Sequence, residues 1–197
     1  MGSRAQTAKH AKDGENDKFL YGACSMQGWR KSNEDAMITD LDIGDGNSLF
    51  AVFDGHGGEH IAKYCKKHFV EFLIQNKRYK EQEYSLALKE TMVKLDQRLL
   101  LEVGRNSLHE IVAELKKSKR PKVSKSTKFF EEKRIGGIPY HMGCVASIVL
   151  ITRDYIYCAN LGDSRTTMAE KMNENRIEIV ELSHDHKPMN EIEEGRI

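Results

Sequence analysis

The sequence predicts an α+β fold in which helices pack on an antiparallel sheet. Three observations predict this class. Short apolar runs bounded by turn residues come first, two segments with apolar residues at three- and four-residue spacing follow, and short apolar runs return from Gly143 onward. Strands, then helices, then strands along 197 residues indicate one α+β domain, or part of a larger one.

Three strands are predicted before the helices. Phe19 to Met26 has strand-like composition and ends at a turn signal, and Ala36 to Leu41 is a second short strand. Asp42 to Asn47 is a turn cluster rich in Asp and Gly. Ser48 to Phe53 is then a continuous apolar strand that leads directly into Asp54.

Two amphipathic helices are predicted over Ile61–Leu73 and Tyr84–Val103, each with one apolar stripe that covers a surface. Arg105 to Lys117 adds a third, shorter helix. Residues 1–17 are polar and rich in Lys, Gly and Asp, so we expect a flexible N-terminal arm there, with the folded domain over 18–197.

The last part of the chain is predicted to form two strand pairs. Val145 to Thr152 and Tyr155 to Asn160 are joined by a short turn. Ser164 to Met168 and Arg176 to Glu181 form the second pair across a turn rich in Asn. Between helices and strands, a basic and poorly periodic segment covers about 116–140; we interpret it as a solvated loop, with a docking patch for an acidic partner as the alternative.

Composition excludes several classes of protein. The chain has 31 basic and 30 acidic side chains, so no basic excess points to a nucleic-acid partner. No apolar run approaches the roughly 20 residues of a membrane span, and Met1 to Asn16 lacks the apolar stretch of a secretory signal. We therefore expect a soluble protein of the cytoplasm or nucleus.

The cysteines are far apart and include no CxxC pair. Cys65 falls on the apolar face of a predicted helix and Cys158 in a predicted strand, so we interpret both as buried thiols; the other two are Cys24 and Cys144.

Acidic residues stand at strand ends or in adjacent turns at three places: Glu34-Asp35, Asp54 and Asp163. Carboxylates that converge repel one another unless a cation lies between them, and oxygen ligands select magnesium, manganese or calcium over zinc. An Asp-Gly pair taken alone is usually a turn. The long apolar strand before Asp54 and the histidine at position 56 favour a ligand instead.

Arg30 lies four residues before the carboxylate pair. Its guanidinium offers a planar fork that matches two phosphate oxygens. The alternative is an ordinary surface ion pair with Glu34 or Asp35, and the spacing alone does not decide between them.

Four motifs in order resemble signatures of the protein phosphatase 2C family, over the chain from about Phe19 to its end. They are Arg30-x-x-Asn33-Glu34-Asp35, Phe53-Asp54-Gly55-His56-Gly57-Gly58, Ala159-Asn160-Leu161-Gly162-Asp163-Ser164-Arg165 and Leu182-Ser183-His184-Asp185-His186-Lys187-Pro188. The resemblance implies an antiparallel β-sandwich flanked by helices, a four-layer αββα arrangement, with two divalent cations, Mg²⁺ or Mn²⁺, at one edge.

The resemblance also implies a ligand set. Asp54 would bridge both ions, and the Gly55 carbonyl would ligate one of them. Glu34 would bind that ion directly or through water, and Asp35 would hold coordinated waters. Asp163 matches a carboxylate associated with a weaker third metal position.

The implied reaction is hydrolysis of phosphoserine and phosphothreonine in proteins by a water molecule that the two metals activate. Arg30 would grip the substrate phosphate, and His56 is the candidate general acid for the leaving alkoxide. Asp185 and His186 are interpreted as structural. Phosphorylated proteins are the expected partners, and a complete protein is expected to be a monomer.

The sequence departs from the family pattern in two respects. The segment Gly143-Cys144-Val145-Ala146 lacks the two hydroxyls of the family's strand entry. Family members also continue beyond the point that matches Ile197 and supply two further metal-binding aspartates there. Three interpretations stay open: part of an active phosphatase, an incomplete gene product, or an inactive pseudophosphatase that acts as a binding module. We expect the chain alone to be inactive and its sandwich incomplete at the C-terminus.

Overall fold

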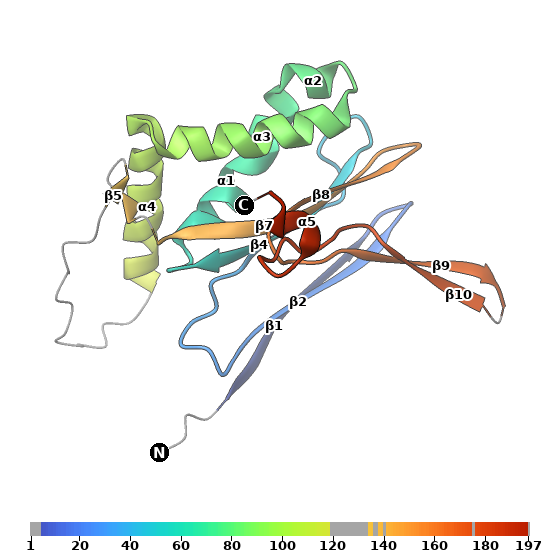
Figure 1. Ribbon diagram of the computed structural model, residues 1–197, viewed down its shortest axis with the longest axis horizontal. Coiled ribbons are helices and arrows are strands. Elements are labelled where there is room, and N and C mark those ends of the chain that lie inside the picture. The colour runs from blue at the N-terminus through green and yellow to red at the C-terminus, as the bar shows by residue number, and fades with distance from the viewer. Residues whose placement is uncertain (1–4, 119–133, 136–137, 140, 175, 197) are drawn as a thin grey trace. The chain divides into compact units, whose positions relative to one another are not determined.

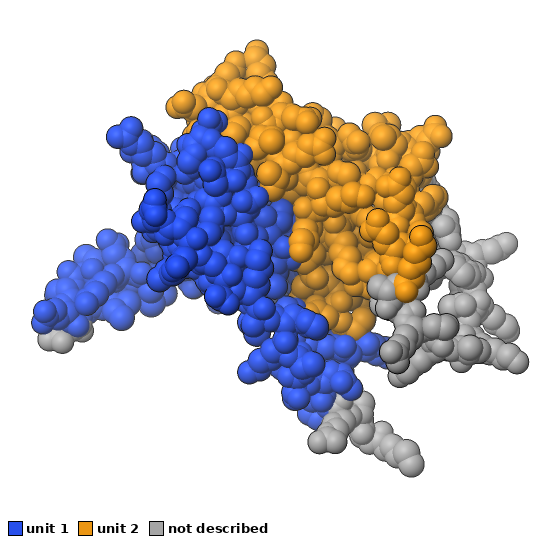
Figure 2. All heavy atoms as spheres, turned by 180° about the vertical axis from the view of Figure 1, so that it is seen from behind, with its two compact units in different colours: residues 1–31, 37–54, 145–197 blue, residues 32–36, 55–144 orange. Residues whose placement is uncertain are grey.

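The structure, a computed structural model, describes residues 5–118, 134–135, 138–139, 141–174 and 176–196. The chain divides into two compact units, coloured separately in Figure 2. The first unit comprises residues 1–31, 37–54 and 145–197, and the second comprises 32–36 and 55–144. Helices and antiparallel strands occupy separate parts of the chain, which confirms the predicted α+β class.

The first unit begins with two long paired strands. β1 (Gln6–Glu15) pairs antiparallel with β2 (Leu20–Gly28), as Figure 1 shows. The expectation of an arm without regular structure over residues 1–17 is therefore wrong for the residues of β1. Nearly every side chain of β1 is exposed, so no apolar pattern marks the strand in the sequence. Backbone pairing with β2 holds it instead.

Four strands form the larger sheet: β3 (Ala36–Asp40), β4 (Ser48–His56), β7 (Gly143–Ile151) and β8 (Ile156–Leu161), in the order β3-β4-β7-β8. β7 and β8 pair antiparallel in the predicted way, with Ile148 opposite Ala159. All four strands were expected from their apolar runs.

The buried face of this sheet is apolar. Leu49 and Phe53 of β4 and Ile148 and Leu150 of β7 are at most 1% exposed. Truncating a side chain as large as Phe53 to alanine leaves a cavity, which typically costs about 3–5 kcal/mol of unfolding free energy. These packed residues fix the position of β4, and therefore of the residues at its end.

A second two-stranded ribbon follows, made of β9 (Thr167–Asn173) and β10 (Arg176–Glu181). The predicted partner of β10 began at Ser164, but β9 begins three residues later. The reason lies at Thr166, whose N–H donates to Ser183 Oγ at 2.8 Å and whose hydroxyl contacts Ser147 Oγ at 2.6 Å. A short helix, α5 (Glu191–Glu194), ends the first unit.

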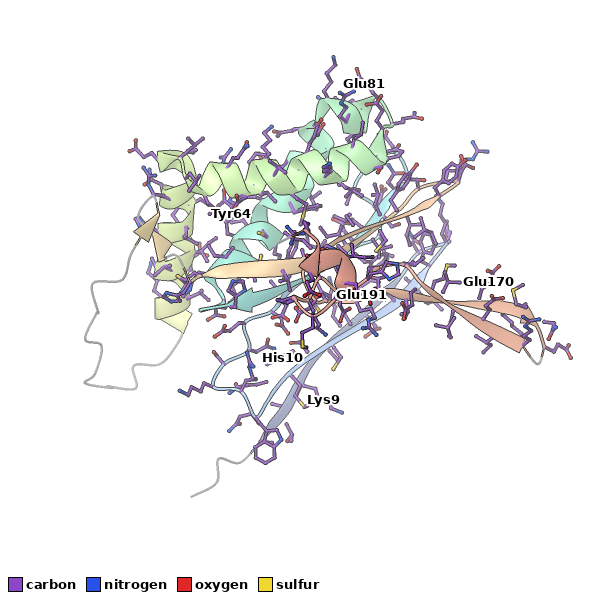
Figure 3. All side chains as sticks on the ribbon, in the orientation of Figure 1. Lys9, His10, Tyr64, Glu81, Glu170 and Glu191 are labelled. Atoms are coloured by element: carbon purple, nitrogen blue, oxygen red, sulfur yellow. The ribbon has the colours of Figure 1, made fainter. Side chains whose placement is uncertain are left out.

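Helices dominate the second unit: α1 (His60–Gln75), α2 (Lys77–Lys80), α3 (Tyr84–Leu99) and α4 (Glu102–Ser118). α1, α3 and α4 contact one another. Their buried apolar residues confirm the two predicted stripes: Ile61, Tyr64, Phe69, Phe72 and Leu73 on α1, and Leu88, Leu95 and Leu99 on α3. Figure 3 labels Tyr64 on α1.

The predicted helix Tyr84–Val103 is in fact two helices. α3 ends at Leu99, and the N–H of Leu101 donates to the Arg98 carbonyl in a tight turn before α4 begins. Gly104 lies so close to the Arg98 carbonyl that a side chain would not fit there. The predicted third helix, Arg105–Lys117, therefore begins earlier, and at 17 residues it is not shorter than the other two.

Two very short strands, β5 (Arg134–Ile135) and β6 (Ile138–Pro139), pair near the end of the second unit. Most of the predicted basic loop at about 116–140, residues 119–133 in particular, lies outside the described residues. None of the helices in the described part of the chain is long and apolar enough to cross a membrane.

Candidate metal and phosphate site

Strand β4 carries two of the predicted site residues on its exposed face. Phe53 and Gly55 are buried, whereas Val52, Asp54 and His56 are exposed. Alternate residues of a strand point to opposite faces, so Asp54 and His56 share a face. The buried residues anchor the strand while the aspartate and the histidine stay accessible.

Gly55 allows two backbone segments of the second unit to approach each other closely. A Cβ atom at this position would lie 2.5 Å from the Glu34 carbonyl oxygen and 3.1 Å from the Gly58 carbonyl oxygen. Because both atoms belong to the backbone, neither can move aside without distorting the chain. Any residue other than glycine would push the Glu34 segment away from the end of β4.

The Glu34 carboxylate is held by two hydrogen bonds. Ser32 Oγ donates to Glu34 Oε1 at 2.9 Å, and the Gly58 N–H donates to Glu34 Oε2 at 3.1 Å. A carboxylate has about four acceptor positions, so both oxygens keep capacity for a cation. Glu34 is half-buried and fixed in orientation, as a metal ligand requires.

The turn that follows His56 needs glycine for its backbone conformation. Gly57 and Gly58 have φ values of 69° and 129°, which side chains disfavour. A Cβ at Gly57 would also lie 2.6 Å from the His141 carbonyl oxygen. These two glycines let the chain turn from β4 directly into α1.

The His56 ring packs against the backbone of β7. A Cβ on Gly143 would lie 2.6 Å from His56 Nε2, so the absence of a side chain at Gly143 makes room for the imidazole. His56 as a residue is exposed. The imidazole therefore lies against the Gly143 backbone while the residue stays accessible to solvent.

Arg30 has a fixed backbone and an exposed side chain. Its N–H donates to the Gln27 carbonyl at 3.3 Å, and Gln27 Nε2 donates to its carbonyl at 2.8 Å. The guanidinium forms no hydrogen bond or ion pair with any residue that the structure describes. Asp35 is exposed, and its N–H donates to Asn33 Oδ1 at 3.1 Å.

Asp163 stands in the loop after β8, next to a glycine with φ of 98°. That glycine, Gly162, packs against Val145, accepts from the His186 N–H at 2.9 Å and donates to His186 Nδ1 at 3.3 Å. The Asp163 carboxylate is exposed and has no hydrogen-bond or ion-pair partner among the described residues. These contacts agree with a structural role for His186.

Asp185 is surrounded by cations. Arg165 Nε donates to Oδ1 at 2.9 Å and Lys187 Nζ donates to Oδ2 at 2.8 Å. These hydrogen bonds, that of Arg165 first, lower the pKa of Asp185 to about 2. The carboxylate is occupied on both oxygens, which agrees with the structural role expected for it.

The structure brings some of the predicted site residues together within each unit. In the second unit Glu34 contacts Gly55 through its backbone and the Gly58 turn through its carboxylate. In the first unit no hydrogen bond or ion pair joins Arg30, Asp54 and Asp163. Across the described residues, no three His, Cys, Asp or Glu side chains gather closely enough to hold a metal ion between them.

Two residues that position the site were not expected from the sequence. Ser32 holds the Glu34 carboxylate, and its place two residues earlier is a local signal that could have found it. Gly143 lies against the His56 ring, although the two residues are almost 90 positions apart in the sequence. No local pattern at either residue predicts that contact.

Comparison with known proteins decides the family. The family profile described as Protein phosphatase 2C matches residues 19–197. The chain belongs to the protein phosphatase 2C family. The predicted resemblance is thereby confirmed, on a match that contains all four motifs.

Protein phosphatase 2C relatives align over almost the whole chain. Protein phosphatase 2C 1 of Paramecium tetraurelia is 37% identical over 195 residues, covering 99% of this chain and 56% of the relative. Protein phosphatase 2C homolog 3 of Schizosaccharomyces pombe is 33% identical over 200 residues, covering 99% of this chain and 39% of the relative. The chain spans about half the length of the curated relatives it matches.

Solved structures share the protein phosphatase 2C fold with this chain. The serine-threonine phosphatase 2C of Toxoplasma gondii has a TM-score of 0.53 at 18% identity, over 98% of this chain and 56% of that one. A sex determining protein of C. elegans has a TM-score of 0.55 at 21% identity, over 98% and 38%. The sandwich-type α+β fold expected from the motifs is therefore supported at the level of fold.

Proposed function

We propose that this chain carries part of the catalytic centre of a metal-dependent phosphatase that hydrolyses phosphoserine and phosphothreonine in proteins. The observation that carries the proposal is Asp54, an exposed carboxylate without a cationic partner among the described residues. Buried residues of β4 on either side hold it in place, and it lies within the family match over residues 19–197. An exposed carboxylate without a cationic partner can bind a metal ion, whereas the Asp185 carboxylate is already bonded to Arg165 and Lys187.

The donor set of the site fits a hard divalent cation, Mg²⁺ or Mn²⁺. Asp54, the Gly55 carbonyl, Glu34, Asp35 and Asp163 offer only oxygen atoms, and neither thiol nor imidazole is among them. The two hydrogen bonds at Glu34 orient its oxygens in advance. Two cations bound to these residues would supply an activated water and neutralise phosphate charge.

Arg30 is proposed to bind the phosphate group of the substrate. Its guanidinium is exposed and occupied by no described residue, so it can meet two phosphate oxygens with parallel N–H donors. The hydrogen bonds of Gln27 to the backbone at Arg30 and Lys31 hold the base of the side chain in place. Positioning of the phosphate is what this residue would contribute to catalysis.

His56 is proposed to donate a proton to the leaving serine or threonine oxygen. An alkoxide leaves poorly, and a positioned general acid typically accelerates such a step by about 10²–10⁴-fold. The Gly143 backbone beneath the ring restricts its motion, which supports a positioning function for Gly143.

Phosphorylated proteins are the proposed substrates, and an intracellular monomer is the proposed form of the whole protein. Family membership supports the substrate class. The alternative is a module that binds phosphoproteins without hydrolysing them, in the manner of a pseudophosphatase.

Phosphatase assays test the proposal directly. Hydrolysis of an aryl phosphate and of a phosphothreonine peptide is measured with Mn²⁺, with Mg²⁺ and with a chelator. The assay uses the 197-residue chain and a longer version with the full length of the relatives. Turnover that depends on the metal and on Asp54 supports the proposal. Peptide binding without turnover in the longer version contradicts it and supports the binding module.

A further inference from the structure

Two cysteines of the second unit lie in direct contact. Cys65 Sγ, on α1, is 3.6 Å from Cys144 Sγ, near the start of β7. Both side chains are half-buried, and none of the four cysteines forms a disulfide. The residues are distant in sequence, so the fold alone brings these two thiols together.

The contact is close to what a disulfide needs. The two sulfurs of a disulfide are separated by about 2.05 Å, so the pair must approach by roughly 1.5 Å more. Cys144 is also one of the positions at which this chain departs from the family pattern, because it replaces a hydroxyl residue at the strand entry. The sequence therefore places a thiol where Cys65 can reach it.

The surroundings of Cys65 disfavour its thiolate form. The pKa of Cys65 is raised well above its usual range, first by the hydrogen bond with Cys144 and then by burial. Cys65 thus keeps its proton at neutral pH. The thiolate is the form that reacts with oxidants, so Cys65 is poorly suited to react first, and the neighbouring Cys144 is the thiol that remains for the first step.

We propose that Cys65 and Cys144 form a reversible oxidation site that hydrogen peroxide converts to a disulfide. The Cys144 thiolate attacks one peroxide oxygen, the O–O bond breaks, and the departing hydroxide takes a proton to leave as water. Cys144 is then a sulfenic acid. Cys65 sulfur attacks this sulfur, the S–O bond breaks, and the Cys65 proton leaves with hydroxide as a second water. The two thiols are oxidised, the peroxide is reduced, and a thiol reductant restores the pair.

The other two cysteines provide matched controls. Cys158 is half-buried, and its pKa is raised by burial, while its hydroxyl neighbour is Thr166 rather than a second thiol. Cys24 is exposed on β2. If accessibility alone governed oxidation, Cys24 would react first; if proximity governs it, the contacting pair reacts as a unit.

Peptide mapping of the whole chain after peroxide treatment tests the proposal. The expected result is a disulfide-linked peptide pair containing Cys65 and Cys144, the loss of two of the four thiols, and recovery of both on reduction. Cys24→Ser and Cys158→Ser are expected to leave this linkage intact. The measurement is independent of phosphatase activity, so it stands whether or not the proposed function does.

Single variants test the order of the two steps. In Cys65→Ser, a sulfenic acid at Cys144 should accumulate and react with dimedone, whereas in Cys144→Ser the Cys65 thiol should stay unmodified at the same peroxide dose. Circular dichroism checks that each variant is folded, and the wild-type peptide map decides the linkage if a variant is not. Linkages that involve Cys24 or Cys158 instead, or an intact Cys65–Cys144 thiol pair at a dose that oxidises Cys24, would overturn the proposal.

Discussion

Asp54 and Asp185 both occur in motifs crowded with aspartate, glycine and histidine, yet their surroundings are opposite. Asp185 is half-buried and bonded on both oxygens, to Arg165 and Lys187. Asp54 is exposed, and its carboxylate forms no ion pair with a described residue. A carboxylate that the protein itself neutralises contributes to stability, whereas one left without a partner is available to a ligand. We therefore propose that the pattern of partners, rather than the richness of the motif, separates a metal ligand from a structural aspartate here.

Neutralising each aspartate in turn, in the longer version of the protein, tests this difference most directly. Asp54→Asn should lower metal-dependent turnover by more than about a hundredfold, because even the loss of an outer-shell partner of a metal costs roughly 10–100-fold. Its melting temperature should change little. Asp185→Asn should lower the melting temperature and leave turnover nearly intact. Thermal denaturation and the phosphatase assay provide both readings, and equal losses of turnover in two folded variants would contradict the assignment.

Arg30 extends the comparison to a cation that has no partner among the described residues, and the longer version of the protein serves for this test as well. Arg30→Ala should raise the KM for phosphorylated peptide by about 10–100-fold, because a hydrogen bond to a charged group contributes roughly 1.5–3 kcal/mol. The concentration of Mn²⁺ for half-maximal activity should stay the same. Lys31→Ala, at the exposed neighbouring position, is the matched control. A loss of metal affinity with unchanged KM would make Arg30 a structural partner of the carboxylates.

Ser32 tests whether the hydrogen bonds at Glu34 prepare it for a metal. Ser32→Ala removes the donor to Glu34 Oε1 and should weaken Mn²⁺ binding about tenfold. Calorimetric titration with Mn²⁺ measures this effect without substrate. Ser85→Ala, on the exposed side of α3, should have no effect. An unchanged affinity in Ser32→Ala would show that Glu34 needs no such support.

At acidic pH, Asp185 should no longer stabilise the folded state. Its pKa is lowered from 3.8 to about 2, so the folded state favours the ionised form. The resulting stabilisation is fully present above the unfolded-state value and is lost as the pH falls toward 2. Urea midpoints of the wild type and Asp185→Asn should therefore differ at neutral pH and converge across this acidic window. A difference that stays constant with pH would mean that the ion pairs do not stabilise the fold.

A third arrangement places two carboxylates opposite each other. Glu170 of β9, labelled in Figure 3, lies opposite Glu178 of β10. Among the ion pairs of the described residues, Glu178 has one, with Arg176 at 4.0 Å. Glu170→Lys should stabilise the ribbon by up to about 1 kcal/mol. Hydrogen exchange of the β9–β10 amides measures this change. Glu174→Lys makes the same charge change outside the paired positions, and equal protection in both variants would count against the cross-strand effect.

The apolar patterns predicted the buried elements well. β2, β3, β4, β7 and β8 and the helices α1 and α3 were all expected from residues that the structure buries or pairs. β1 was missed because its stability comes from backbone pairing, which leaves no mark in the pattern of side chains. The break between α3 and α4 was missed because it depends on the contact of Gly104 with Arg98 rather than on a helix-breaking residue at Leu100.

The site could be predicted only as a set of residue types. The motifs predict the carboxylates and Arg30 as site residues, and the structure adds why some of these residues are held in place; their roles stay a prediction. The contact of Gly143 with His56 and the contact of Cys65 with Cys144 join residues far apart in sequence, so no local pattern could reveal them. Only the packing of strands and helices in the structure shows these two contacts.

The pairing of β1 with β2 has a practical consequence for producing the protein. The first fifteen residues carry few apolar side chains, so they invite removal before crystallisation. Removal would strip the N–H and C=O groups of β2 of their partners along one edge, next to Leu20, which is 80% exposed, and the exposed Cys24. Bare strand edges recruit other chains. A shortened polypeptide that starts after β1 should therefore elute as oligomers and cross-link through Cys24 in air, whereas the chain that keeps these residues should not.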